Sequence, residues 1–568
     1  MYTLRNALWM ACLALPWLNP FAPGPSPAVV PWLVSLLCVA GLLAVAPLAR
    51  LPRSYTLFFI AVCAYFTLLF GINALENGIE TAATVLAWLC LMLCAMVGAA
   101  LPLQGQKPHS EASPNGLDAP GVAALATVWL AVALLSVFMG ACQYWAIDTW
   151  FAPWISASAD NAAYANLRQR NQFASLCSIG LAALLFLHQR SPVRAGTASL
   201  WWGAATLLAL GNSLSSSRTG ALQWPLLVLA LVCWRGSVAP ATRRLGYGAL
   251  GIFAIISVLM PFVAQLAGND ATGLWGRAQE GLSGSSRWWL YSNVLELIAQ
   301  KPWLGWGWRE LAITHYSTQF PTRFVEILDN AHNLPLHLAV ELGLPFALLF
   351  CGTVLWALVR AAPWRERHPS RQLAWSVLLI LGLHSMVEYP LWYGPFLMSL
   401  GLCVGLLGAR SAVLPVDFSS QKDQKSPLLK EKIASYRTNN APIATVLIAI
   451  TGFIAFDYHR VSQMYLPVAQ RSAWYQGDAL RHALESPLFT RQAQFAELVI
   501  SPVTRDNAPR MLALSTSLMH YSPEPRVIEA LIESAVQLHF DDIAAFHLAR
   551  YRDTFPVPYA AWSALKPH

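Results

Sequence analysis

The feature that most constrains this chain is a long series of apolar runs, most of them close to the roughly 20 residues that a helix needs to cross a bilayer. Thirteen candidate spans lie near residues 5–21, 28–48, 55–74, 80–101, 120–142, 172–188, 197–213, 220–234, 246–266, 334–359, 373–389, 395–410 and 441–457. Soluble domains carry about 25% charged residues, whereas this chain has only 12%. The sequence therefore predicts an all-α, polytopic membrane protein with about 13 transmembrane helices.

Lysine and arginine recur in every second loop between these runs, and the first two of the alternate loops contain neither residue, which predicts the topology. They occur at Arg50 and Arg53, Lys107, Arg190 and Arg194, Arg235 to Arg244, Arg360 to Arg371, and Arg410 to Arg437. Because cytoplasmic loops carry an excess of Lys and Arg, the N-terminus is predicted to be cytoplasmic and the C-terminus to lie on the far side of the membrane. The first run is predicted to be an uncleaved span, because the residues after it form a poor cleavage region.

The sequence predicts four parts. Residues 1–266 hold transmembrane helices one to nine, 267–333 form a large far-side loop with catalytic elements, 334–457 hold helices ten to thirteen, and 458–568 form a far-side helical domain. The last part contains amphipathic patterns with proline breaks, which are typical of helix–turn–helix pairs and compatible with tetratricopeptide-like packing. The basic stretch 417–440 is predicted to be a solvated cytoplasmic loop.

His332 is the strongest candidate for chemistry. It precedes span ten on the far side, within "DNAHNLPLHLAVELG". Histidine is the side chain best suited to exchange a proton near neutral pH. An interfacial histidine that helps to satisfy a helix N-terminus is the simpler alternative for His332 taken alone. His337 follows five residues later, which is the wrong spacing for a zinc pair four residues apart, so no metal site is predicted.

Two arginines on the same predicted side provide partners for His332. Arg218 lies in "NSLSSSRTGALQWP" between two spans, and Arg287 begins an amphipathic stretch in the long loop. Each arginine alone could be a solvated charge or a contact to a lipid headgroup. Together they offer two planar guanidinium groups, which suit phosphate oxygens.

Two further polar segments reach the same face. "NLRQRNQFASL" brings Gln169 and Asn171 to the entrance of span six, and "HSMVEYPLWYGPF" brings Glu388 and Tyr389 to the end of span eleven. A polar helix start and an aromatic interface belt explain these segments equally well. Glu388 is expected to pair with an arginine.

This set of groups suits displacement at a carbon that bears a phosphate leaving group. The histidine would take the proton from an attacking hydroxyl, and the arginines would bind the pyrophosphate and stabilise its growing charge. No P-loop, dinucleotide fingerprint or aspartate-rich metal motif is present. No cofactor and no nucleic-acid partner are predicted.

The chain resembles a known superfamily in these same segments. "KPWLGWGWRE" and "NAHNLPLHLAVELGLP" are similar to the signature loop of the O-antigen ligases and polymerases, and "RQRNQFASL" with "HSMVEYPLWYGPFL" narrows the resemblance to bacterial protein O-oligosaccharyltransferases of the pilin-glycosylating (PglL) type. The resemblance implies a multi-pass enzyme of the bacterial inner membrane with a periplasmic C-terminal domain. It would transfer a glycan from undecaprenyl pyrophosphate to serine or threonine hydroxyls of a periplasmic protein such as pilin.

The resemblance also implies roles for individual residues. The catalytic positions are His332 with Asn333, the donor-phosphate positions are Arg218 and Arg287, and the substrate-binding positions are Gln169, Asn171, Glu388 and Tyr389. The family usually has Gln-Pro-Asn where this chain has Gln169-Arg170-Asn171. Because proline fixes φ and arginine does not, the local backbone at Gln169 is expected to differ.

Three alternatives stay open at this level. A lipopolysaccharide O-antigen ligase or a polymerase would use another acceptor, and the far-side tail of about a hundred residues argues for a protein acceptor instead. A flippase or transporter would need polar residues at mid-membrane depth and broken helices, whereas here the polar clusters lie at one end of the spans. A structural membrane scaffold is the third alternative.

Overall fold

The computed structural model describes residues 2–21, 26–72, 78–103, 120–158, 161–191, 195–266, 286–409 and 440–565. Within these ranges the chain is helical and contains no strand, so the predicted all-α class is confirmed. Each of the thirteen predicted spans overlaps a helix. Most of the basic stretch 417–440 and the first part of the loop 267–333 lie outside the described residues.

Six helices among the described residues are long and apolar enough to cross a membrane. They are Ile79–Ala100, Pro120–Tyr144, Arg170–Arg190, Pro240–Leu266, Leu344–Arg365 and Ala441–Tyr465. Four shorter apolar helices are Val29–Val45, Arg53–Leu69, Arg218–Cys233 and Gly394–Gly408. The structure therefore supports a multi-pass membrane protein, while the count of thirteen spans and their orientation stay predictions.

The chain divides into two compact units. The first unit comprises Met1–Thr67, Thr84–Gln279 and Ala357–Thr451, and the second comprises Leu68–Ala83, Glu280–Trp356 and Gly452–His568. The division into 1–266, 267–333, 334–457 and 458–568 remains a prediction about topology.

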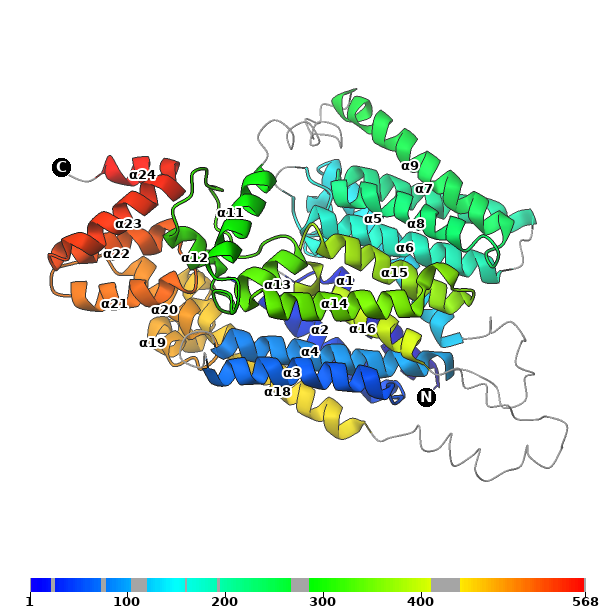
Figure 1. Ribbon diagram of the computed structural model, residues 1–568, viewed down its shortest axis with the longest axis horizontal. Coiled ribbons are helices and arrows are strands. Elements are labelled where there is room, and N and C mark those ends of the chain that lie inside the picture. The colour runs from blue at the N-terminus through cyan, green and yellow to red at the C-terminus, as the bar shows by residue number, and fades with distance from the viewer. Residues whose placement is uncertain are drawn as a thin grey trace. The chain divides into compact units, whose positions relative to one another are not determined.

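The first unit is built around one buried helix. Its helices are α1 (Tyr2–Leu18), α2 (Val29–Val45), α5 (Pro120–Tyr144), α6 (Arg170–Arg190), α7 (Ala198–Leu214), α8 (Arg218–Cys233), α9 (Pro240–Leu266), α15 (Pro369–Ser385) and α16 (Gly394–Gly408), with most of α3 (Arg53–Ile72) and α4 (Gly78–Ala100). α6 packs against α5, α7, α8 and α15 (Figure 1). Because α6 is covered on all sides, the polar groups at its N-terminus are held by several neighbouring helices.

Small residues allow α4 and α16 to approach closely. A Cβ atom at Gly405 would lie 1.8 Å from the carbonyl oxygen of Ala95, and one at Gly98 would lie 2.2 Å from that of Leu402. Gly401 and Gly405 are four residues apart on one face of α16, which is the small-residue spacing that membrane helices use for close packing.

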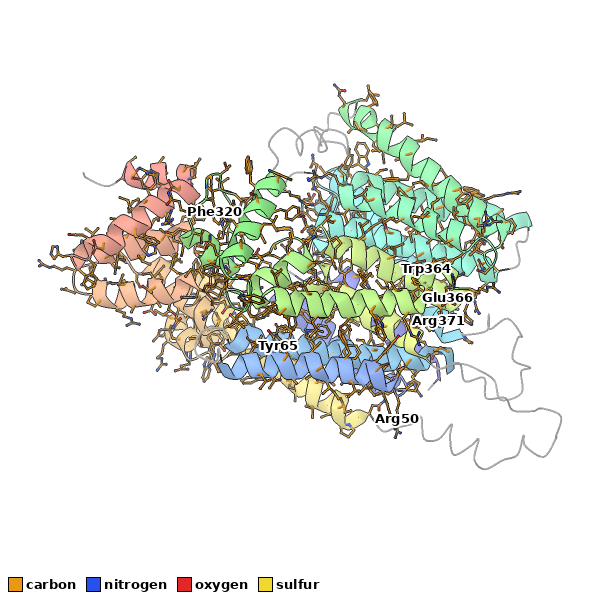
Figure 2. All side chains as sticks on the ribbon, viewed as in Figure 1. Arg50, Tyr65, Phe320, Trp364, Glu366 and Arg371 are labelled. Atoms are coloured by element: carbon orange, nitrogen blue, oxygen red, sulfur yellow. The ribbon has the colours of Figure 1, made fainter. Side chains whose placement is uncertain are left out.

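The basic loop at residues 362–368, directly before α15, is held by an ion pair. Arg371 Nε donates to Glu366 Oε2 over 2.8 Å, and its Nη1 donates to the carbonyl oxygen of Leu407 over 2.7 Å (Figure 2). These contacts attach the loop to the end of α16.

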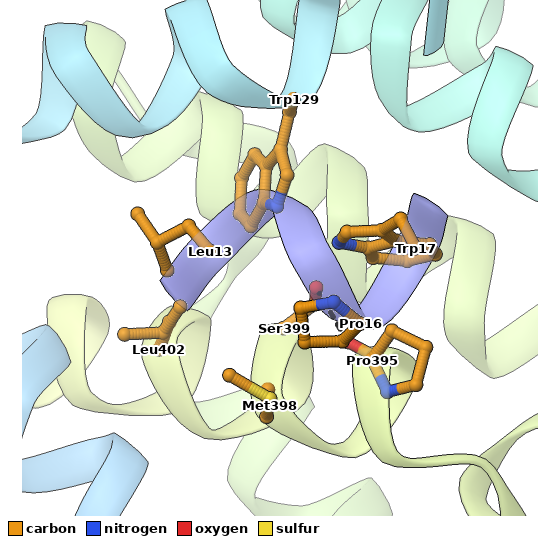
Figure 3. A pocket seen from close by; sticks show the side chains of 8 residues that line it. All are labelled: Leu13, Pro16, Trp17, Trp129, Pro395, Met398, Ser399 and Leu402. Atoms are coloured by element: carbon orange, nitrogen blue, oxygen red, sulfur yellow. Dashed lines mark hydrogen bonds between the residues drawn. The ribbon is translucent and has the colours of Figure 1, made fainter. Parts of the chain in front are cut away.

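A small cavity lies within the first unit. It is lined by Leu13, Pro16, Trp17, Trp129, Pro395, Met398, Ser399 and Leu402 (Figure 3). The lining contains no titratable side chain. We therefore interpret the cavity as a packing gap near the proline inside α1, and not as a reaction site.

The second unit combines the described part of the loop 267–333 with the C-terminal helices. Its helices are α11 (Ser286–Gln300), α12 (Leu311–Ser317), α13 (Leu334–Leu342), most of α14 (Leu344–Ala361), the end of α18 (Ala441–Ser462), α19 (Ala479–Leu484), α20 (Thr490–Ile500), α21 (Ala508–Met519), α22 (Pro525–Gln537), α23 (Asp541–Thr554) and α24 (Pro556–Ser563). Successive C-terminal helices pack on one another. Tyr316 of α12 is buried in the same core as Leu518, Leu531 and Tyr551, so the loop and the C-terminal helices share one hydrophobic core.

The predicted span 334–359 is wrong as one continuous helix. The chain forms a short helix, α13, and then a separate long apolar helix, α14, with Gly343 between them. Gly343 has φ +85°, and a Cβ there would lie 2.2 Å from the carbonyl oxygen of Trp303. Only glycine combines this backbone conformation with this close approach. The candidate membrane span therefore begins at Leu344, and α13 precedes it.

Candidate active site

His332 is held in a constrained turn directly before α13. Its φ is +49°, a left-handed conformation that is uncommon for residues other than glycine and that often occurs at functional sites. The side chain of Asn330 accepts a hydrogen bond from His332 N over 2.9 Å, and Ala331 is fully buried. The His332 side chain is half-buried. The turn therefore constrains the backbone from which the imidazole projects.

Asn333 begins α13. Its side-chain oxygen accepts from Leu336 N over 3.1 Å, which is the N-cap interaction, and Pro335 follows within the first turn. Asparagine at the N-cap and proline at the helix start are both favoured pairings of sequence and structure. Asn333 thus positions the helix on which the His332 turn rests.

The segment "PWLGWG" at 302–307 completes the other end of α13. Trp306 N donates to the carbonyl oxygen of Val340 over 2.9 Å, Gly307 N to that of Glu341 over 3.0 Å, and Leu344 N to that of Pro302 over 2.8 Å. The last carbonyls of a helix have no partner within the helix, and this segment satisfies two of them. This segment, which is part of the family resemblance, therefore stabilises the C-terminal end of the short helix α13.

A buried pair lies inside α13. His337 Nε2 is 3.4 Å from Glu341 Oε2, and the two side chains are 1% and 0% exposed. Burial lowers the pKa of His337 to about 3, with a smaller contribution from the positive charge of Arg309. Burial also raises the pKa of Glu341 to about 8, and Arg309 offsets part of that increase. Burial thus favours the neutral form of both groups.

Arg287 lies on the helix that contacts the His332 turn. Tyr291, one helical turn further along α11, has its hydroxyl 3.5 Å from the carbonyl oxygen of His332. Residues four apart share a helix face, so Arg287 lies on the face of α11 that carries this contact. Tyr291 was not among the residues predicted for the site.

In the first unit, Gln169 and Asn171 lie at the start of α6. The side-chain oxygen of Gln169 caps α6 by accepting from Gln172 N over 2.6 Å. Asn171 Nδ2 donates to Glu388 Oε1 over 3.2 Å. Tyr389 follows directly, with its ring stacked on Tyr393 at 6.1 Å. Four predicted substrate-binding residues therefore belong to the first unit, and two of them are hydrogen-bonded to each other.

Arg218 opens α8 beside this pair. Ser217 caps α8 by accepting from Gly220 N, and its hydroxyl donates to Asn171 Oδ1 over 2.6 Å. Ser215, Ser216 and Ser217 are buried, whereas Arg218 is exposed. Ser217 thus joins α8 to α6, and Arg218 lies at the surface of that junction.

A polar network behind this junction was not predicted. His384 Nδ1 lies 2.9 Å from Ser175 Oγ, which accepts from Gln223 Nε2 over 2.7 Å, and Gln223 Oε1 accepts from Ser178 Oγ over 2.8 Å. Glu388 N donates to the His384 carbonyl oxygen over 2.9 Å. The spacing of His384 and Glu388 was visible in the sequence, but the partners come from α6 and α8. The network ties α15 to the two helices that carry Asn171 and Arg218.

The candidate residues therefore form two groups, one in each unit. His332, Asn333 and Arg287 belong to the second unit, and the other five belong to the first. No group of three or more His, Cys, Asp or Glu side chains in the described part of the chain is arranged to hold a metal ion. The absence of a metal requirement stays a prediction.

Three family models match separate parts of the sequence. The one described as "Virulence factor membrane-bound polymerase, C-terminal" matches residues 372–568, "O-Antigen ligase" matches 203–351, and "Protein glycosylation ligase" matches 163–188. The second match includes Arg218, Arg287 and His332, and the third includes Gln169 and Asn171.

Two curated relatives come from Acinetobacter baylyi (strain ATCC 33305 / BD413 / ADP1). The "General O-oligosaccharyltransferase" is 26% identical over 293 residues, which is 50% of each chain. The "ComP-specific O-oligosaccharyltransferase" is 22% identical over 274 residues, which is 48% of this chain and 49% of the relative. The chain thus spans about half the length of the curated relatives it matches. These matches confirm the predicted resemblance: the chain is similar to the O-antigen ligase and protein glycosylation ligase families and to relatives named O-oligosaccharyltransferases.

Proposed function

We propose that this protein is a glycosyltransferase of the bacterial inner membrane that transfers a glycan from undecaprenyl pyrophosphate to serine or threonine hydroxyls of periplasmic proteins such as pilin. The observation that carries the proposal is the left-handed turn of His332, within the segment that resembles the O-antigen ligases. Such strain persists only where the surroundings enforce it. An imidazole carried on a backbone constrained in this way suits a general base.

In the proposed reaction His332 takes the proton of the acceptor hydroxyl. The hydroxyl oxygen attacks the anomeric carbon of the first sugar, and the bond between that carbon and the pyrophosphate oxygen breaks. Undecaprenyl pyrophosphate leaves with the electron pair of that bond. General base catalysis contributes roughly 10²- to 10⁴-fold, and no metal or nucleotide is required, because the donor is already activated.

The donor would be bound by the arginines and the amide groups. Arg218 and Arg287 bind the pyrophosphate and stabilise the negative charge that grows on it. Gln169, Asn171, Glu388 and Tyr389 bind the sugars. The proposal requires these residues and His332 to act on one donor molecule. Substitutions in the first-unit residues and in the second-unit residues should therefore both reduce the use of the donor.

A lipopolysaccharide ligase or an O-antigen polymerase is the second candidate, favoured by two of the family matches. The match to a protein glycosylation ligase at 163–188 and the two relatives named O-oligosaccharyltransferases favour a protein acceptor. Periplasmic glycoproteins and lipopolysaccharide from cells with and without the gene distinguish the candidates. If the deletion leaves protein glycans unchanged and removes the lipopolysaccharide O-chain, the ligase function is correct.

The catalytic test is His332→Asn in purified protein with a lipid-linked glycan and an acceptor protein. Asparagine tolerates the left-handed conformation, so the turn is kept while the base is lost. We expect the transfer rate to fall by at least about 10²-fold. His539→Asn is the matched control, because His539 also has a positive φ, of +57°, and is exposed. Equal activity of the two variants would contradict a catalytic role for His332.

A further inference from the structure

We infer that His520, on the C-terminal helices, is a positioning residue for the reaction. Through Glu310 it fixes the segment that packs against α13, the helix that follows the candidate base. This inference rests on the proposed function and gives the C-terminal helices a role within the reaction that is separate from acceptor docking.

The first contact joins α21 to the start of α12. His520 is the C-cap residue of α21, and its Nδ1 donates to Glu310 Oε2 over 2.8 Å. Glu310 is the N-cap residue of α12, but its side chain makes no capping hydrogen bond. An acidic side chain at a helix start ordinarily interacts with the N-terminus of its own helix. Here it is directed to a histidine 210 residues away in the sequence.

The residues before Glu310 pack against α13. Arg309 has φ +70°, which turns the chain sharply at this point. The Trp308 ring is 5% exposed and meets the His337 ring edge-on, with 5.9 Å between the centroids. Gly307 N donates to the Glu341 carbonyl oxygen over 3.0 Å. A displacement of Glu310 would therefore move two contacts of α13.

α13 connects these contacts to His332. It has only nine residues, and Asn333 is its N-cap. His337 is one turn beyond Asn333, and its backbone N–H donates to the Asn333 carbonyl oxygen over 2.8 Å. A helix this short has little stability of its own, so its position depends on the packing at His337 and Glu341.

A second contact fixes the other end of α12. The Tyr316 hydroxyl lies 3.1 Å from His547 Nδ1, and the two rings are stacked with 5.8 Å between their centroids. Tyr316 is 1% exposed. α12 is thus held on α21 at one end and on α23 at the other, so that two contacts attach the segment 307–317 to the C-terminal helices.

The two roles predict different kinetics. If the C-terminal helices only dock the acceptor, breaking the Glu310–His520 contact leaves transfer to a short acceptor peptide unchanged. If they position the candidate base, kcat falls for a short peptide and for a folded acceptor protein alike, while KM for each acceptor stays the same. The hydrolysis of the lipid-linked glycan by water should fall in parallel, because it needs no acceptor.

The test uses His520→Ala, Glu310→Ala and their double variant in the full-length protein. We expect each single variant to lower kcat by on the order of 10-fold, which is typical for a lost hydrogen bond to a charged group. The double variant should be no slower than the slower single variant, because both remove one contact. His520→Gln keeps a donor and should restore most of the rate.

Arg510→Ala is the matched control. It breaks an ion pair between Arg510 and Glu497 within the C-terminal helices, without touching the segment 307–310. If His520→Ala behaves like this control, or raises only KM for the folded acceptor, the positioning role is wrong. A wild-type protein that transfers no glycan would instead refute the proposed function. Equal melting temperatures of the His520 and Arg510 variants exclude loss of fold as the cause of a kcat difference.

Discussion

At the scale of single residues, Arg218 is the clearest case of a side chain whose position conflicts with its own helix. It is the first residue of α8, where the helix dipole disfavours a positive charge by roughly 0.3–1 kcal/mol. Its neighbours Ser217 and Thr219 are buried, and Arg218 itself is exposed. An anion bound at this point would be favoured both by the guanidinium and by the helix N-terminus. This is the property that the proposed donor pyrophosphate requires.

Substitution of Arg218 should therefore weaken donor use. For Arg218→Ala we expect KM for the lipid-linked glycan to rise by roughly 10- to 100-fold, the usual effect of a lost charge-assisted hydrogen bond. Arg218→Lys keeps the charge without the two-pronged geometry and should be intermediate. Arg235, exposed beyond the other end of α8, supplies the control variant Arg235→Ala. Initial rates over a range of donor concentrations give KM for the donor in each variant. An unchanged donor KM in Arg218→Ala would contradict a role of Arg218 in donor binding.

The candidate residues could be selected from the sequence because each is a polar side chain next to an apolar run, and this pattern is visible within one short segment. Asn171 and Glu388 were chosen as separate polar residues at span ends, and the structure joins them by a hydrogen bond. The network of Ser175, Gln223 and His384 could not be predicted. Those residues come from three helices, and the sequence of one helix does not indicate which other helices pack against it.

At the scale of elements, the break between α13 and α14 determines the geometry around His332. The helices themselves could be predicted, because each apolar run favours a helix. The break was missed, because a single glycine within an apolar run is usually tolerated by a helix. What requires the break is the approach of the Trp303 carbonyl oxygen to Gly343, a contact between segments 40 residues apart in the sequence.

Gly343→Ala should therefore damage both stability and activity. The methyl group meets the Trp303 carbonyl oxygen, and alanine is strained at φ +85°, so we expect at least about 1 kcal/mol of destabilisation. Gly352→Ala is the control within α14, because a Cβ there meets nothing within 4 Å. That variant should be neutral or gain up to about 1 kcal/mol. The two variants are compared by their melting temperatures in detergent and by their transfer rates. Equal values for both variants would show that the break between α13 and α14 contributes to neither stability nor activity.

At the scale of the whole molecule, both units bury histidine side chains. His384 of the first unit lies 2.9 Å from Ser175 Oγ, and His315 of the second unit lies 3.1 Å from Asn293 Oδ1. Histidine is the side chain that titrates closest to neutral pH. The burial of His315 should therefore make the stability of the second unit depend on pH.

Acidification should destabilise the second unit through His315. The ring is 1% exposed, lies 3.1 Å from Asn293 Oδ1 and stacks on Phe320. Burial, with a smaller contribution from the positive charge of Arg323, lowers the pKa of His315 from 6.5 to about 3. Between these values the unfolded chain binds a proton that the folded chain excludes. The stabilisation is therefore complete above pH 6.5 and is lost as the pH falls toward 3.

The expected slope is at most about 1.4 kcal/mol per pH unit. Melting curves of the detergent-solubilised protein between pH 7.5 and pH 4.5 measure it. His315→Gln cannot titrate and should flatten the pH dependence, at the expense of some stability at pH 7.5. His539→Asn, at an exposed position, should retain the wild-type slope. A His315→Gln protein that loses stability with acid as steeply as wild type would show that other groups control the acid response. The core shared by α12 and the C-terminal helices would then be insensitive to this histidine.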